Sequence, residues 1–126
     1  AIFDLDIDIY SPCALGATVN PDTILRLKCE IIAGAANNQL ADEDRDGKLC
    51  ADKGILYAPD FLINAGGLIH VYSEIKGHNK EHAITQTRAI YDTTLEIFKK
   101  AELNGITTHA AALAIAEKRI TDRKNQ

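Results

Sequence analysis

The sequence predicts an α/β fold in which short parallel strands alternate with helices. Apolar segments at residues 3–10, 31–33 and 55–57 are separated by stretches with helix caps or helical spacing. Strands that alternate with helices form parallel sheets with right-handed crossovers. The chain has 126 residues, 46% of them hydrophobic, which is enough to bury the core of one domain. We therefore expect one parallel sheet followed by C-terminal helices.

The three expected strands differ in pattern. Residues 3–10 alternate apolar and polar side chains, which indicates a strand near the edge of the sheet. Residues 31–33 are continuously apolar and end at Gly34, as expected for a strand covered on both faces. The third strand, at residues 55–57, runs almost directly into Pro59.

Capping residues predict the helices between these strands. Asn20 followed by Pro21 indicates the start of a short helix. A weak helix is expected over residues 48–53, where Gly54 is a suitable C-terminal cap. The acidic run at residues 42–47 is assigned to a solvent-exposed loop.

Helical spacing dominates the remainder of the chain. Apolar residues recur three and four positions apart from Phe61 to Ile75, which predicts one helix ending at Gly77. Asn79 is the expected cap of the longest helix, and Thr107 or Thr108 of the last one. The inward positions expected in that last helix are Leu113, Ala114 and Ile120, and its charged end at residues 119–126 is expected to fray.

A glycine pair, Gly66-Gly67, lies inside the predicted helix that begins near Phe61. Each glycine weakens a helix by about 1 kcal/mol relative to alanine and leaves room for close approach to the backbone. We therefore expect a ligand or a neighbouring helix to approach there.

Three unusual loops follow the strands directly, at residues 11–16, 34–39 and 58–60. In parallel sheets, ligands bind beyond the carboxyl ends of the strands, so these loops are expected to form one binding edge. Asparagine side chains can position a carboxamide, a ribose hydroxyl or a carboxylate but cannot act as acid or base. Asn37, Asn38 and Asn64 are therefore expected to be positioning residues, and helix capping or Asx turns are the alternative.

Composition excludes several classes of protein. The net charge is −4 and the basic residues are scattered, which argues against nucleic-acid binding. No stretch approaches 18 uncharged apolar residues, so we expect neither a membrane span nor a signal peptide. Cys13, Cys29 and Cys50 match no disulfide or zinc framework, which favours the cytoplasm. The Cys13 thiol has no neighbouring base and is expected to be an inert packing group. The backbone of Cys13 is expected to be the part that contributes to the binding edge.

Two patterns resemble metal sites, but we expect no metal. Residues 42–47 match the first half of a calcium loop, yet the twelfth position is Lys53 instead of a carboxylate. His78 and His82 have the spacing of some zinc peptidases, but no further ligand lies on the same helical face. A metal-dependent hydrolase thus remains an alternative that elemental analysis would test. His70 and His109 are expected to be surface or packing residues.

The loop motifs resemble the amino-acid dehydrogenase family that includes the glutamate, leucine, phenylalanine and valine enzymes, and most of all its leucine-specific branch. Three motifs occur in the family's order: SPCALG from residue 11, AGAANNQ from residue 33 and YAPD…NAGG from residue 57. The resemblance implies the second half of a Rossmann-type NAD-binding domain at residues 1–76, with C-terminal helices at 77–126 packed on it. It also implies reversible NAD-dependent oxidative deamination of an L-amino acid, by a cytoplasmic homo-oligomer of which this chain is a C-terminal portion.

The resemblance also implies roles for individual residues. The positions implied to contact NAD are Cys13 and Ala14 at the nicotinamide ribose, and Ala35, Asn37 and Asn64 near the nicotinamide. Asn37 would also hold the substrate carboxylate. Leu68 and Val71 would line the substrate pocket, which implies a small apolar, leucine-like amino acid. An apolar wall stabilises a leucine side chain by about 2 kcal/mol and disfavours a glutamate carboxylate.

The chain departs from the family pattern in what it lacks. It contains no GxGxxG motif, and no lysine lies in a motif that matches the family's catalytic lysine. The catalytic lysine and aspartate are expected upstream, so no catalytic residue is assigned here and the 126 residues alone are expected to be inactive. The alternative is a non-catalytic dinucleotide-fold fragment that serves as an oligomerisation or binding module.

Overall fold

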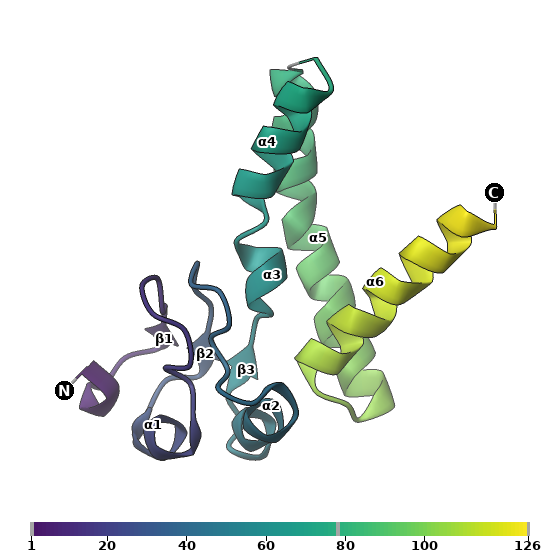
Figure 1. The fold of residues 1–126 in the computed structure, drawn as a ribbon. Coiled ribbons are helices and arrows are strands. Elements are labelled where there is room, and N and C mark those ends of the chain that lie inside the picture. The colour runs from purple at the N-terminus through teal and green to yellow at the C-terminus, as the bar shows by residue number, and fades with distance from the viewer. Residues whose placement is uncertain (1, 78, 126) are drawn as a thin grey trace.

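A computed structural model describes residues 2–77 and 79–125 and shows a parallel sheet of the predicted kind. The strands β1 (Ile9–Tyr10), β2 (Ile31–Ile32) and β3 (Leu56–Tyr57) are parallel and follow the order β1-β2-β3 (Figure 1). Ile31 of β2 is in register with Ile9 on one side and with Leu56 on the other. The α/β fold with a parallel sheet is therefore confirmed.

Two helices connect the strands and cover one side of the sheet. They are α1 (Pro21–Arg26) and α2 (Glu43–Asp52), which lie side by side below the strands in Figure 1. Asn20 caps α1 as predicted, since its side chain accepts a hydrogen bond from the Thr23 N–H while the Thr23 hydroxyl accepts one from the Asn20 N–H. The buried hydrophobic core here consists of Tyr10, Val19, Ile24, Leu27, Cys29, Ile32, Leu40, Cys50, Ile55 and Tyr57.

The expected strand over residues 3–10 is wrong for most of its length. Residues Ile2–Asp4 form a short 3-10 helix, η1, and only Ile9–Tyr10 pair with the sheet. Asp4 is instead held by the Arg26 guanidinium at 2.6 Å, and Arg26 lies over the Phe3 ring. The contacts of Asp4 and Phe3 with Arg26 of α1 thus compete with extension of the strand.

The start of α2 also differs from the prediction, because the acidic run assigned to a loop is the beginning of a helix. The Asp42 side chain accepts a hydrogen bond from the Arg45 N–H, which caps α2. Asp46 is fully buried and accepts hydrogen bonds from the Asp42 N–H and from the Arg45 guanidinium. Burial alone would raise the pKa of Asp46, but these bonds outweigh it and lower that pKa.

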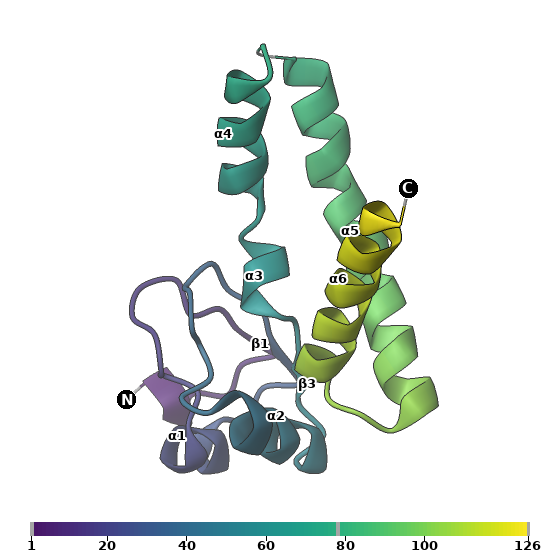
Figure 2. The same cartoon turned by 45° about the vertical axis from the view of Figure 1, so that its right-hand side comes forward.

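Beyond the sheet, the chain forms an upright arm of helices. The predicted helix from Phe61 is divided into α3 (Asp60–Ile63) and α4 (Gly66–Ile75), and α4 packs beside α5 (Lys80–Asn104) (Figures 1 and 2). Asn79 caps α5 as predicted, and Gly105 ends it with a φ of 61°.

The two glycines at the start of α4 differ in their surroundings. A Cβ at Gly67 would meet no atom within 4 Å, and one at Gly66 would meet only the Thr87 methyl at 3.7 Å. The neighbouring helix α5 thus approaches Gly66 but not Gly67, and close approach by a ligand at Gly67 stays a prediction.

The last helix, α6 (Thr108–Lys124), begins beside β3, packs against α5 and extends away from the sheet toward the C-terminus (Figures 1 and 2). Thr107 caps it by accepting a hydrogen bond from the Ala110 N–H. The predicted inward face is wrong for two of its three residues: Leu113 and Ile120 are exposed, and Ala114 is half-buried. The buried positions are His109, Ala111, Ala112 and Ile115. Within the described residues α6 continues to Lys124, and fraying of its charged end stays a prediction.

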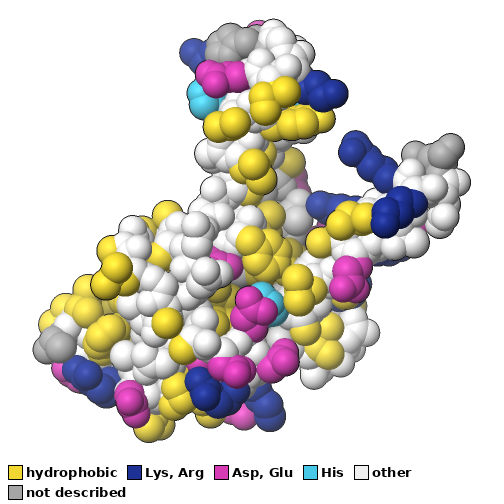
Figure 3. Space-filling model, in the orientation of Figure 1, with side chains coloured by type: hydrophobic (Ala, Val, Ile, Leu, Met, Phe, Trp, Pro, Cys, Tyr) yellow, Lys and Arg dark blue, Asp and Glu magenta, His cyan; other side chains and the backbone are white. Residues whose placement is uncertain are grey.

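The molecule exposes more surface than a compact protein of its mass. Its accessible area is 8332 Å², whereas a compact monomer of 13.7 kDa exposes about 6,600 Å². Hydrophobic side chains are visible along the arm in Figure 3. The exposed hydrophobic residues of the arm include Leu68, Tyr72 and Ile75 on α4 and Tyr91 and Leu95 on α5. The apolar face predicted for this helix is thus present on α4, but its side chains are exposed to solvent.

Candidate functional site at the carboxyl ends of the strands

The loops that follow the three strands meet at one edge of the sheet, as predicted. The Ala36 N–H donates to the Pro12 carbonyl at 2.9 Å, and the Ala17 N–H donates to the Asn38 carbonyl at 2.7 Å. Gly34 allows the first two loops to touch, since a Cβ there would lie 2.2 Å from the Pro12 oxygen. The loops rise from the sheet on the side of α3 (Figure 1).

Two of the predicted positioning residues contact each other across this edge. The Asn64 carboxamide nitrogen donates to the Asn37 side-chain oxygen at 2.5 Å and to the Ala35 carbonyl at 3.2 Å. The Ala35 carbonyl can only accept, so the contacting atom of Asn64 must be nitrogen and that of Asn37 must be oxygen. The NH₂ group of the exposed Asn37 is consequently the end available to a ligand.

Cys13 is the third member of this cluster, and its side chain differs from the expectation. The thiol is exposed instead of packed. Ser11 lies 3.4 Å from the sulfur, and the Ala35 N–H donates to it at 3.5 Å. The contact with Ser11, followed by that with Ala35, lowers the pKa of the Cys13 thiol, whereas burial raises the pKa of Cys50 to about 12.

This difference in pKa predicts selective modification. Iodoacetamide at neutral pH is expected to alkylate Cys13 at least about tenfold faster than Cys29 or Cys50, because only exposed thiols with thiolate character react readily. Mass spectrometry of tryptic peptides over time measures the three rates. A Cys13→Ala variant should lose the fast phase, and equal labelling of all three cysteines in the folded chain would contradict the expectation.

Buried polar groups that the sequence did not indicate hold the loops of this three-loop edge together. Gln39 is fully buried and its N–H donates to the Asp60 carboxylate at 3.1 Å, while Asp60 also accepts from the Phe61 N–H. Burial, with the nearby Asp60 charge, raises the pKa of Tyr57 above its usual range. The only sequence signal for Gln39 was its position beside two asparagines after a buried strand.

His109 joins α6 to the same region and is a packing residue, one of the two options expected for it. Its ring lies 3.1 Å from the Glu43 carboxylate and meets the Phe61 ring edge-on with centroids 5.7 Å apart. The Thr108 hydroxyl donates to the Tyr57 carbonyl at 2.6 Å. The first turn of α6 therefore supports β3 and the start of α3.

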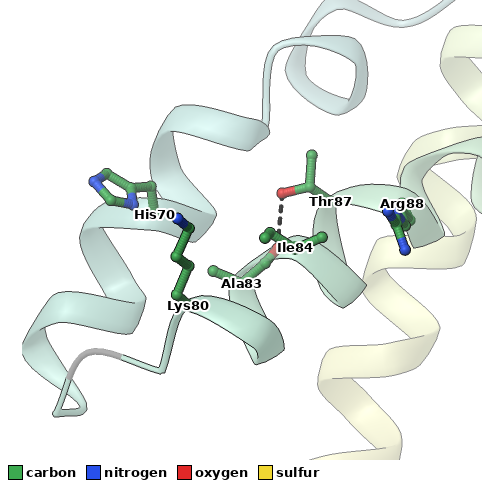
Figure 4. Close-up of a pocket in the computed structure, with 6 residues that line it drawn as sticks. All are labelled: His70, Lys80, Ala83, Ile84, Thr87 and Arg88. Atoms are coloured by element: carbon green, nitrogen blue, oxygen red, sulfur yellow. Dashed lines mark hydrogen bonds between the residues drawn. The ribbon is translucent and has the colours of Figure 1, made fainter.

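Leu68 and Val71 lie on α4, and both are exposed, by 74% and 52%. A separate groove of about 500 Å³ lies between α4 and α5, lined by His70, Lys80, Ala83, Ile84, Thr87 and Arg88 (Figure 4). None of the predicted cofactor or substrate residues lines that groove. The three-loop edge, which none of these six residues belongs to, is therefore a candidate site distinct from this groove.

Over residues 2–77 and 79–125, no group of three or more His, Cys, Asp or Glu side chains is placed to hold a metal ion. The predicted pair His78 and His82 lies partly outside the described residues, since His78 is not described. In the same part of the chain, no helix has the length and apolarity needed to span a bilayer.

Comparison with known proteins identifies the family. The sequence pattern of the glutamate/leucine/phenylalanine/valine dehydrogenases matches residues 1–125. The chain belongs to this family. The family resemblance seen in the loop motifs is therefore confirmed.

Relatives within the family carry several substrate names. The chain is 51% identical to leucine dehydrogenase of Thermoactinomyces intermedius over 119 residues, covering 94% of this chain and 32% of that protein. It is 53% identical to L-tryptophan dehydrogenase of Nostoc punctiforme over 123 residues, covering 98% and 35%. Phenylalanine dehydrogenase of Bacillus thermotolerans is 52% identical, with 98% and 32% covered. The chain thus spans about a third of the length of these family members.

Solved structures agree with the fold. The crystal structure of L-tryptophan dehydrogenase from Nostoc punctiforme superimposes with a TM-score of 0.94 at 52% identity, covering 99% of this chain and 37% of that one. A hetero-hexameric glutamate dehydrogenase from Thermus thermophilus has a TM-score of 0.76 at 21% identity, covering 96% and 30%. The second likeness concerns the fold alone.

Proposed function

We propose that this chain is the cofactor- and substrate-facing segment of an NAD-dependent L-amino-acid dehydrogenase. The reaction proposed is reversible oxidative deamination of a leucine-like amino acid to its 2-oxo acid and ammonia. The observation that carries this proposal is the contact of Asn64 with Asn37 and Ala35, beside Cys13, at the carboxyl ends of parallel strands. In parallel sheets this edge is where nucleotide cofactors bind.

The proposed roles follow from the exposed groups at the edge. Cys13 and Ala14 would contact the nicotinamide ribose, and Ala35, Asn37 and Asn64 would face the nicotinamide. With its oxygen held by Asn64, Asn37 offers two N–H donors, which suit the carboxylate of the amino acid or a carbonyl of the cofactor. NAD, bound here, would accept the hydride from the substrate.

The proposed substrate class depends on α4. Leu68 and Val71 present open apolar side chains, and covering them with a leucine side chain stabilises the complex by about 2 kcal/mol. A glutamate side chain would lose the hydration of its carboxylate there without gaining a partner. The names leucine, phenylalanine and tryptophan dehydrogenase among the relatives also support an apolar substrate.

The catalytic lysine and aspartate are proposed to lie elsewhere in the complete polypeptide, and residues 1–126 alone are expected to be inactive. Residues 1–76 would complete the NAD-binding domain, on which residues 77–126 pack. The large exposed surface supports burial against the remainder of the subunit or against other subunits in a cytoplasmic homo-oligomer.

A chimeric enzyme tests the proposal directly. The segment of Nostoc punctiforme L-tryptophan dehydrogenase that matches this chain is replaced by residues 1–126, and NADH formation is followed with leucine, valine, phenylalanine, tryptophan and glutamate. We expect turnover of apolar amino acids, with leucine or valine preferred and glutamate excluded. The parent enzyme is the control for the assay.

Two results would oppose the proposal. A chimera that folds and assembles like the parent but forms no NADH would favour the non-catalytic module. Measurable leucine oxidation by the 126-residue chain alone would show that its chemistry does not need an external lysine and aspartate.

A further inference from the structure

Gln39 occupies the centre of the three-loop edge although it touches no solvent. Its side chain is fully buried, and its carboxamide nitrogen donates to the Gly34 carbonyl at 2.7 Å and to the Ala36 carbonyl at 2.8 Å. The Gln39 backbone contributes two more bonds, since its N–H donates to Asp60 and its carbonyl accepts from the Val19 N–H at 2.9 Å. One residue thus joins the loops after all three strands.

These bonds determine which groups of the second loop face outward. Gly34 and Ala36 are buried with their carbonyls directed to Gln39, whereas Ala35 and Asn37 between and beside them are exposed. Asn38 has a φ of 52°, in the left-handed region, and this reversal returns the chain to the interior at Gln39. The loop is therefore wrapped around the Gln39 carboxamide with Asn37 on its outer side.

The chemistry of the contact requires a side chain with N–H donors at this position. Two carbonyl oxygens converge on one NH₂ group, so a residue without donors leaves both acceptors unpaired in the interior. A glutamate of the same length would set a carboxylate against two carbonyl oxygens, and only its protonated form could donate to one of them. Asn64 holds Asn37 from the side of α3, and Gln39 supports the same loop from within.

We propose that Gln39 is a positioning residue that sets the Asn37 carboxamide for the reaction without touching the cofactor or the substrate. This inference rests on the proposed dehydrogenase function. The orientation of Asn37 would then depend on the buried Gln39 side chain as well as on the exposed Asn64.

Variants of the chimera test this role through kcat at saturating substrate. Gln39→Met, which keeps the length but removes the donors, is expected to lower kcat at least tenfold at saturating substrate. Gln39→Glu should lose as much at high pH and recover in part as the pH is lowered. Cys50→Ala, a fully buried site in α2, is the control for lost stability and should keep kcat within twofold. A Gln39→Met variant with kcat within twofold of the unmodified chimera would overturn the proposal.

A second measurement separates this inference from the proposed function. In the NMR spectrum of the 126-residue chain, the side-chain amide signals of Asn37 and Asn64 should shift on Gln39→Met and stay in place on Cys50→Ala. If the unmodified chimera is inactive, the function fails, and unshifted amide signals would then refute the positioning role independently. If Gln39→Met does not fold, the same two readouts of Gln39→Glu decide.

Discussion

Replacing Gly34 with alanine is expected to destabilise the chain by about 3 kcal/mol, the upper part of the usual range for overpacking. The new Cβ would lie 2.2 Å from the Pro12 oxygen, 2.6 Å from its nitrogen and 2.7 Å from its Cδ. All three atoms belong to the backbone or a rigid ring, so relief requires that the first two loops separate. Urea unfolding followed by circular dichroism measures the change.

Gly67→Ala is the matched control for this experiment. It adds the same methyl group where no atom lies within 4 Å, inside α4. Alanine is favoured over glycine in a helix, so this variant should be more stable by about 0.5 to 1 kcal/mol. A Gly34→Ala variant as stable as the unmodified chain would show that the two loops do not cross as closely as the structure places them.

Asn37→Ala is expected to lower kcat/KM of the active chimera about a hundredfold, which corresponds to roughly 2.7 kcal/mol of lost transition-state stabilisation. Asn64 fixes the Asn37 oxygen and leaves its NH₂ group for the substrate carboxylate. Hydrogen bonds to charged groups contribute about 1.5 to 3 kcal/mol, which agrees with a loss of this size. Initial rates at several amino-acid concentrations give kcat/KM.

Asn104→Ala removes the same side chain at the exposed end of α5, where the Asn104 carboxamide donates to the Lys100 carbonyl. This control should change kcat/KM by less than threefold. If Asn37→Ala also stays within threefold, the carboxylate is held by another group and the role proposed for Asn37 is wrong.

Much of the candidate site was predictable because its signals are local. Each of the three loops directly follows an apolar run, and the carboxyl ends of parallel strands lie at the same edge of a sheet. The structure accordingly brings Cys13, Asn37 and Asn64 together. Gln39 was not singled out, since only the folded loop shows that its side chain is buried and donates to the Gly34 and Ala36 carbonyls.

The misses share a physical cause, which is competition from contacts made at a distance. Residues 3–10 have the period of a strand, but Asp4 pairs with Arg26 and the first turn folds back. Helical spacing continues from Phe61 to Ile75, yet the helix is interrupted between α3 and α4. At this interruption the Asn64 side chain donates a hydrogen bond to the Ala35 carbonyl of the second loop.

Helix caps, apolar runs and loop motifs are encoded within a few residues, so the order of elements, the parallel sheet and the family could be deduced from the printed chain. The sequence did not determine which side of each helix is buried. Leu68 and Ile75 are exposed while His109 and Gln39 are buried, because burial depends on which segments meet after the strands have paired. The positive φ of Asn38 and the close contact of Gly34 with Pro12 likewise depend on the packing of the first two loops against each other.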